Sequence, residues 1–166
     1  MEKYTFVDNG RIKIEDIDGK DMMFRNFRGE PGPKNRQGDR NFTIVLHDEE
    51  MAQQLANRHW YVKAVPPRRE GDELTFRIDV KLGYKIDRLK PKIVIHSKQG
   101  AVSIDEDMVY KLDGYRFERY HVVLNPHYWI NDNGEDQIKA YLLEFHGDLV
   151  EDYFADKYAE EEYPAD

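Results

Sequence analysis

The chain has 166 residues, of which 40% are hydrophobic and 13% aromatic, so it can bury the core of one ordinary domain. It has no cysteine, which excludes disulfides and thiolate chemistry, and no run approaches the ~18 apolar residues of a membrane span. The net charge of −8 is uneven, because residues 1–100 carry 20 Lys and Arg against 16 Asp and Glu, whereas residues 101–166 carry 5 against 17. These features predict a cytoplasmic protein that handles a polyanion with its basic front.

Apolar residues that alternate with polar ones predict strands in the first part of the chain. Two such runs flank the turn residues Asp18 and Gly19, so residues 11–27 predict a β-hairpin. Residues 28–40 are polar and rich in glycine and proline, which predicts a loop. Residues 41–46 predict the next strand.

One principal helix is predicted over about residues 48–58. Asp48 is a suitable N-cap, and the acidic residues that follow it suit the positive end of the helix dipole. Met51 and Leu55 form the apolar stripe, and basic residues follow at the end.

The remaining chain again predicts strands. They cover residues 60–65, 74–82, 92–96, 101–104, 115–124 and 138–145. The segment before the last strand contains Asn133-Gly134, a strong hairpin signal, and residues 105–112 predict a short helical turn.

Three strands, a helix and two strands follow the element order of an OB-fold. We therefore predict a mainly β, OB-fold-like Greek-key barrel with one principal helix and additional C-terminal strands. Residues 1–150 are expected to form this single domain, and residues 151–166 a flexible acidic tail.

A group of cations in and beside the polar loop is the first candidate site. Its members are Arg25, Arg28, Lys34, Arg36 and Arg40. Lys and Arg on a loop can reach successive phosphates of a nucleic acid. The flanking Phe24, Phe27 and Phe42 are either core residues or rings on which bases stack.

Residues 58–98 form a second basic stretch, with 11 Lys and Arg against 5 Asp and Glu. Lys81, Tyr84 and Lys85 extend a cationic and aromatic edge there, which is the pattern of a groove for single-stranded nucleic acid. Neighbouring rings in the strand after the helix point to opposite faces, and Tyr61 is the one expected to face outward.

No catalytic motif is recognisable. The chain has neither a phosphate-binding GxxxxGK[ST] loop nor a GxSxG elbow, and its six histidines lack metal-ligand spacing. The acidic residues 105–107 have no second acidic cluster that would complete a nuclease metal site. We expect no enzyme, no cofactor and no metal.

With these residues in view, the chain resembles phage-encoded OB-fold single-stranded DNA-binding proteins. The resemblance rests on Phe24-Arg25-Asn26-Phe27, Gly38-Asp39-Arg40-Asn41-Phe42, Trp60-Tyr61-Val62-Lys63 and the acidic end. It implies sequence-tolerant binding of single-stranded DNA in phage replication or recombination, in the host cytoplasm and without a cofactor. It also implies that the acidic tail competes for the basic groove and contacts replication or recombination proteins.

The expected contacts combine phosphate-binding cations with rings that stack on bases. They are Arg25, Phe27, Arg28, Lys34, Arg36, Arg40, Phe42, Tyr61, Lys81, Tyr84 and Lys85. The alternative is an acidic protein-interaction module, or DNA mimic, that inhibits a host nucleic-acid enzyme. Unpaired strand edges also allow a homo-oligomer, and the pattern does not distinguish DNA from RNA.

Overall fold

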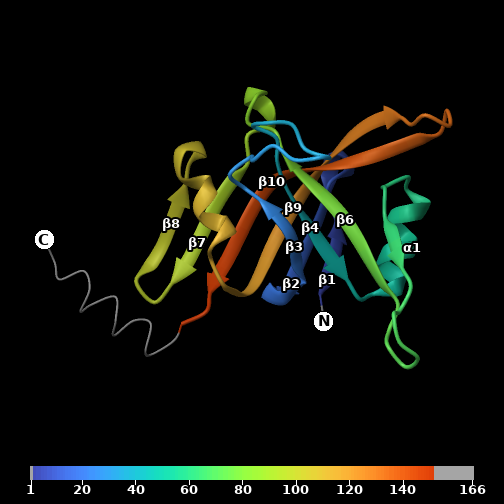
Figure 1. Cartoon of the computed structure of the whole chain (residues 1–166), viewed down its shortest axis with the longest axis horizontal. Helices are drawn as coiled ribbons and strands as arrows, with labels where there is room; N and C mark the ends of the chain where they lie inside the picture. Colours follow the sequence, from blue (N-terminus) through green and yellow to red (C-terminus); the bar gives the residue numbers. More distant parts are fainter. Residues whose placement is uncertain (1, 152–166) are drawn as a thin grey trace, which may run out of the picture.

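The computed structural model describes residues 2–151, which form a ten-stranded β-sheet with one α-helix and short 3-10 helices (Figure 1). The strands are β1 (Lys3–Phe6), β2 (Ile12–Asp18), β3 (Met22–Asn26), β4 (Arg40–Leu46), β5 (Lys63–Val65), β6 (Thr75–Leu82), β7 (Lys92–Ser97), β8 (Gly100–Ile104), β9 (Phe117–Ile130) and β10 (Asp136–Leu149). The helices are α1 (Glu49–Asn57), η1 (Asp8–Gly10), η2 (Gly19–Asp21), η3 (Asp87–Leu89) and η4 (Glu106–Asp113). The predicted OB-like, mainly β fold with one principal helix is confirmed.

The strands follow the order β1-β2-β9-β10-β6-β4-β3 in the sheet, with β5 beside β6, β7 beside β10, and β8 beside β7. β10 runs parallel to β6 and β7, and the other pairs are antiparallel. The three residues of η2 connect β2 directly to β3, so the start of β3, at one end of this path, lies close to the end of β2, near the other end, as in an OB-like barrel.

The predicted hairpin over residues 11–27 is wrong. β2 pairs with β1 and β9, and β3 pairs with β4, so no edge of β2 is left for β3. At the turn between them, an added Cβ on Gly19 would lie 1.6 Å from the carbonyl oxygen of Phe117. Glycine therefore allows the chain to pass close to β9 at the point where it leaves β2 for β3.

The helix and the last hairpin form where they were predicted. The Asp48 side chain accepts a hydrogen bond from the Met51 backbone N–H at 3.2 Å and caps α1. Gly134 adopts a φ of 77° in the turn between β9 and β10. Both strands are longer than expected, so the β9–β10 hairpin projects beyond the barrel (Figure 1).

An aromatic cluster fills the centre of the barrel. Phe27 stacks on Phe42 with 5.1 Å between ring centroids, and Tyr120 stacks on Phe145 at 5.5 Å. The Tyr120 hydroxyl donates a hydrogen bond to the backbone oxygen of Asp21 at 3.1 Å, so this buried phenol has a partner.

His47 lies between two carboxylates where β4 leads into α1. Its Nε2 is 2.9 Å from an Asp21 oxygen, and its Nδ1 contacts Glu73. Burial opposes protonation of the ring, but the hydrogen bonds to Asp21 and Glu73 outweigh it and raise the pKa of His47.

The raised pKa of His47 makes stability depend on pH. Its contribution is complete below the unfolded pKa of about 6.5 and is lost as the pH rises through the higher folded pKa. We therefore expect urea denaturation to show a lower free energy of unfolding at about pH 8.5 than at about pH 6. His47→Gln should reduce this difference, and an equal difference in both chains would contradict the assignment.

Candidate nucleic-acid interface

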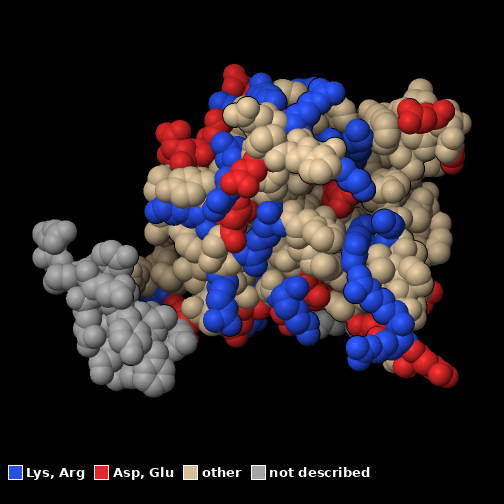
Figure 2. Space-filling view, viewed as in Figure 1, with Lys and Arg blue, Asp and Glu red and all other residues tan. Residues whose placement is uncertain are grey.

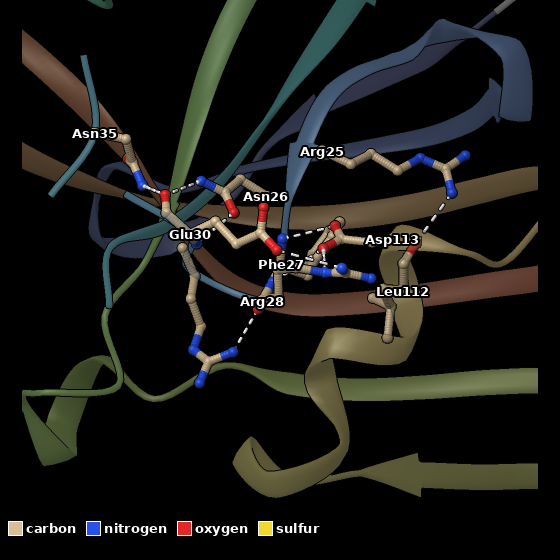
Figure 3. A network of polar contacts seen from close by, with 9 residues as sticks. Arg25, Asn26, Phe27, Arg28, Glu30, Asn35, Leu112 and Asp113 are labelled. Carbon is tan, nitrogen blue, oxygen red and sulfur yellow. Dashed lines mark hydrogen bonds and ion pairs between the residues drawn. The ribbon is translucent and has the colours of Figure 1, made fainter. Parts of the chain in front are cut away.

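Asparagines within and beside the segment between β3 and β4 hold its backbone (Figure 3). Asn26 and the backbone of Glu30 exchange two hydrogen bonds, at 3.0 and 2.9 Å. Asn35 donates to the backbone oxygens of Glu30 and Asp39, and Asn41 donates to Asn35. The polar residues that predicted a loop therefore also fix its shape, because they satisfy its backbone groups.

Two of the predicted phosphate contacts, Arg25 at the end of β3 and Arg28 on the loop, fasten this part of the chain to η4 (Figure 3). Arg25 donates to the backbone oxygen of Leu112 at 3.0 Å, and burial lowers the pKa of its guanidinium. Arg28 Nε lies 3.1 Å from an Asp113 oxygen, and the other Asp113 oxygen accepts from the Phe27 backbone N–H. Both arginines are thus engaged within the protein.

The base of the loop holds three further predicted residues. Arg40 donates to the backbone oxygen of Phe27, and its guanidinium lies 5.8 Å from the ring centroid of Tyr84. Burial raises the pKa of Tyr84 to about 12. Lys85 forms an exposed ion pair with Asp39 at 3.3 Å, which is a weak interaction.

Three predicted cations remain exposed without a carboxylate partner among the described residues. Lys34 and Arg36 lie on the loop, and Lys81 lies on the outer face of β6. In Figure 2 the blue surface runs over the top of the molecule, where the loop lies, and down the right side along β6. These cations can approach an anionic ligand with little rearrangement.

The two predicted stacking residues Phe27 and Phe42 lie in the core, with 0% and 1% of their surface exposed. Their rings pack on each other inside the barrel and present no face to a base, so we correct their place in the site. Tyr61 does face outward, with 48% exposure. Tyr61 and Lys81 line the same groove, of about 530 Å³, between β6 and the β9–β10 hairpin.

Phe24 is an exposed ring that the expected contacts do not include. Strict alternation from the buried Met22 would turn it inward, but an irregularity in the pairing of β3 with β4 turns it outward, to 63% exposure. Its φ of 51° is strained for a bulky residue, and such strain is concentrated at functional sites. The guanidinium of Arg77 lies 5.3 Å from the ring centroid.

Arg77 completes a small polar and aromatic platform with Phe24. It lies opposite Val45 on β4, and its Nε is buried without a hydrogen-bond partner among the described residues. An unpaired buried donor is costly, and an acceptor on a ligand would satisfy it. The basic outer face is defined here as this platform, the exposed loop cations, Lys81 and Tyr61.

Within residues 2–151, no three His, Asp or Glu side chains are placed to hold one metal ion. Among the same residues, no helix has the length and apolar character needed to cross a membrane.

The fold and the site define an OB-like barrel with a basic, aromatic outer face. The family model described as "Putative phage ssDNA-binding domain" matches residues 6–165. The chain belongs to this family, which confirms the predicted resemblance.

Solved structures of phage proteins share the fold. The single-stranded DNA-binding protein of bacteriophage Enc34 is 11% identical, with 93% of each chain covered and a TM-score of 0.56. The structure of that protein in complex with ssDNA is 13% identical, covers 90% of this chain and 92% of its own, and has a TM-score of 0.53. At these identities the likeness concerns the fold alone. No curated protein matches the chain.

Proposed function

We propose that the chain binds single-stranded DNA without sequence preference, through its basic outer face, during phage DNA replication or recombination. The family and the fold support this class of function. The observation that carries the proposal is Phe24, which a strained backbone holds out to solvent beside Arg77. An exposed ring can stack on any base, because every base has a π-face.

The residues of the basic outer face would make two kinds of contact with the strand. Lys34, Arg36 and Lys81 would meet phosphates, and Phe24 and Tyr61 would stack on bases. Arg25 and Arg28 would act indirectly, because they hold the loop against η4. Arg40, Tyr84 and Lys85 would contact the strand at the margin of the face. We propose binding without catalysis and without a cofactor.

Binding through these cations has a measurable dependence on salt. Each phosphate contact on a single strand contributes about 0.7 to the slope of log K against log salt concentration. Replacing Lys34, Arg36 and Lys81 by alanine should therefore lower this slope by about 2 and weaken binding. Fluorescence anisotropy of a labelled oligothymidylate at several salt concentrations measures it.

Lys20→Ala is the matched control for this experiment. Lys20 is an exposed cation of η2, at the opposite end of β3 from the basic loop. Its removal should leave the slope unchanged. A triple variant with the slope of the unaltered chain would rule out these three cations as phosphate contacts.

The acidic end is proposed to compete with DNA for the basic face and to contact replication or recombination proteins. Of the predicted tail, residues 151–166, all but the first residue lie outside the described residues, and residues 152–166 carry six Asp and Glu and one Lys. Deleting them should raise the affinity for oligothymidylate, most clearly at low salt, where charge interactions are least screened. Replacing the six acids by their amides should have the same effect, and unchanged affinity at low salt would disprove the competition.

A further inference from the structure

The groove beside the basic outer face opens where β10 separates from β6. The two strands pair only at Ala140 and Tyr141, and before these residues β10 belongs to the projecting hairpin. The resulting space of about 530 Å³ lies within the range of small-molecule and cofactor sites, ~300–1,000 Å³. Its aromatic, cationic and amide side chains include Tyr61, Lys81, Trp129, Gln137 and Lys139.

Trp129 and Lys139 form the wall of this groove on the hairpin. The Lys139 ammonium lies 3.8 Å from the centroid of the Trp129 ring, so it covers one face of the indole. The indole Nε1 is buried without a hydrogen-bond partner among the described residues. The indole N–H of Trp129 therefore has no acceptor among the described residues, and one face of its ring is covered by the Lys139 ammonium.

The groove holds two lysines, Lys81 and Lys139, that repel each other, and three carboxylates, which give its lining a net charge of −1. Burial lowers the pKa of Lys139, and the positive charge of Lys81 lowers it further. Asp79, Asp132 and Glu135 also line the groove, but none of them forms an ion pair with either lysine. Asp79 instead accepts a hydrogen bond from Thr43 at 2.7 Å. A phosphate between the two ammonium groups would offset their repulsion.

We infer that this groove holds one nucleotide of the bound strand, with its base stacked on Trp129 and its phosphate between Lys81 and Lys139. When the strand binds, the Lys139 ammonium leaves the indole ring. It gives up the cation–π contact and forms a charge-assisted hydrogen bond to the phosphate. The exchange is favourable because a base stacks on an aromatic ring at least as strongly as an ammonium ion binds it. The inference rests on the proposed function and extends the DNA path from the barrel onto the hairpin.

Intrinsic fluorescence tests this inference, because a base that stacks on an indole quenches its emission. The chain has two tryptophans, and Trp60 is a core residue with 4% exposure. Adding oligothymidylate should quench the emission of the unaltered chain, whereas the Trp129→Phe variant should keep the emission of Trp60. Anisotropy of a labelled oligothymidylate, measured in parallel, reports binding itself.

Two substitutions supply an independent readout. Trp129→Ala should lower the affinity about tenfold. Lys139→Gln leaves the ring in place and should lower the salt slope by about 0.7, while Lys20→Gln should not change it. Binding without quenching, together with an unchanged slope for Lys139→Gln, would overturn the inference and leave the proposed function standing. Absence of any binding by anisotropy would overturn both.

Discussion

Replacing Phe24 by alanine is expected to lower the affinity for a single-stranded oligothymidylate about tenfold and to leave the fold intact. A base that stacks on an aromatic side chain contributes ~1–3 kcal/mol, and this contribution is lost with the ring. Phe24 is 63% exposed, so its truncation opens no cavity in the core. Anisotropy gives the affinity, and urea denaturation of the same preparation gives the stability.

Two controls make the Phe24 experiment specific. Phe24→Gly removes the same ring but tolerates the φ of 51°, so it should bind as weakly as Phe24→Ala and be more stable by about 1 kcal/mol. Tyr128→Ala removes another exposed ring, which lies on the other face of the β9–β10 hairpin from the groove, and should bind normally. Unaltered affinity in Phe24→Ala would exclude Phe24 from the DNA-binding face.

Replacing Phe42 by alanine is expected to lower the stability of the fold and to leave the affinity of the folded chain for oligothymidylate unchanged. The Phe42 ring is 1% exposed and packs against Phe27, Tyr120 and Phe145, so its truncation leaves a cavity. Such core truncations cost ~3–5 kcal/mol, a large part of the ~5–15 kcal/mol that stabilises a typical domain. Urea denaturation should show this loss, while the folded fraction should bind oligothymidylate as before. Weaker binding with little loss of stability would instead indicate that Phe42 contacts DNA.

Features that depend only on residues close together in the chain were predictable from the sequence. The cap of α1 at Asp48 and the turn at Gly134 require only local backbone geometry, and both are confirmed. The pairing of β2 was not predictable, because it depends on β1 and on β9, more than 100 residues later in the chain. A local turn signal cannot show which strands will occupy the two edges of β2.

The candidate site likewise combines features that the sequence predicted with features that depend on distant parts of the chain. Composition identified the cations, but not that Arg25 and Arg28 would find partners in η4, more than 80 residues away. The sequence left Phe24 open between the core and a stacking surface, because one irregularity in strand pairing reverses the face on which a side chain lies. Trp129 lies beyond the predicted strand of residues 115–124, although alternation continues through the longer β9.

Titration of a labelled oligothymidylate with the chain that lacks residues 152–166 tests the central proposal most directly. Without the acidic end, the basic outer face is free of its proposed competitor, so binding should be saturable at low salt. It should weaken steeply as the salt concentration rises, because phosphate contacts release counterions. Absence of binding at low salt would contradict single-stranded DNA binding and favour the alternative of an acidic protein-interaction module.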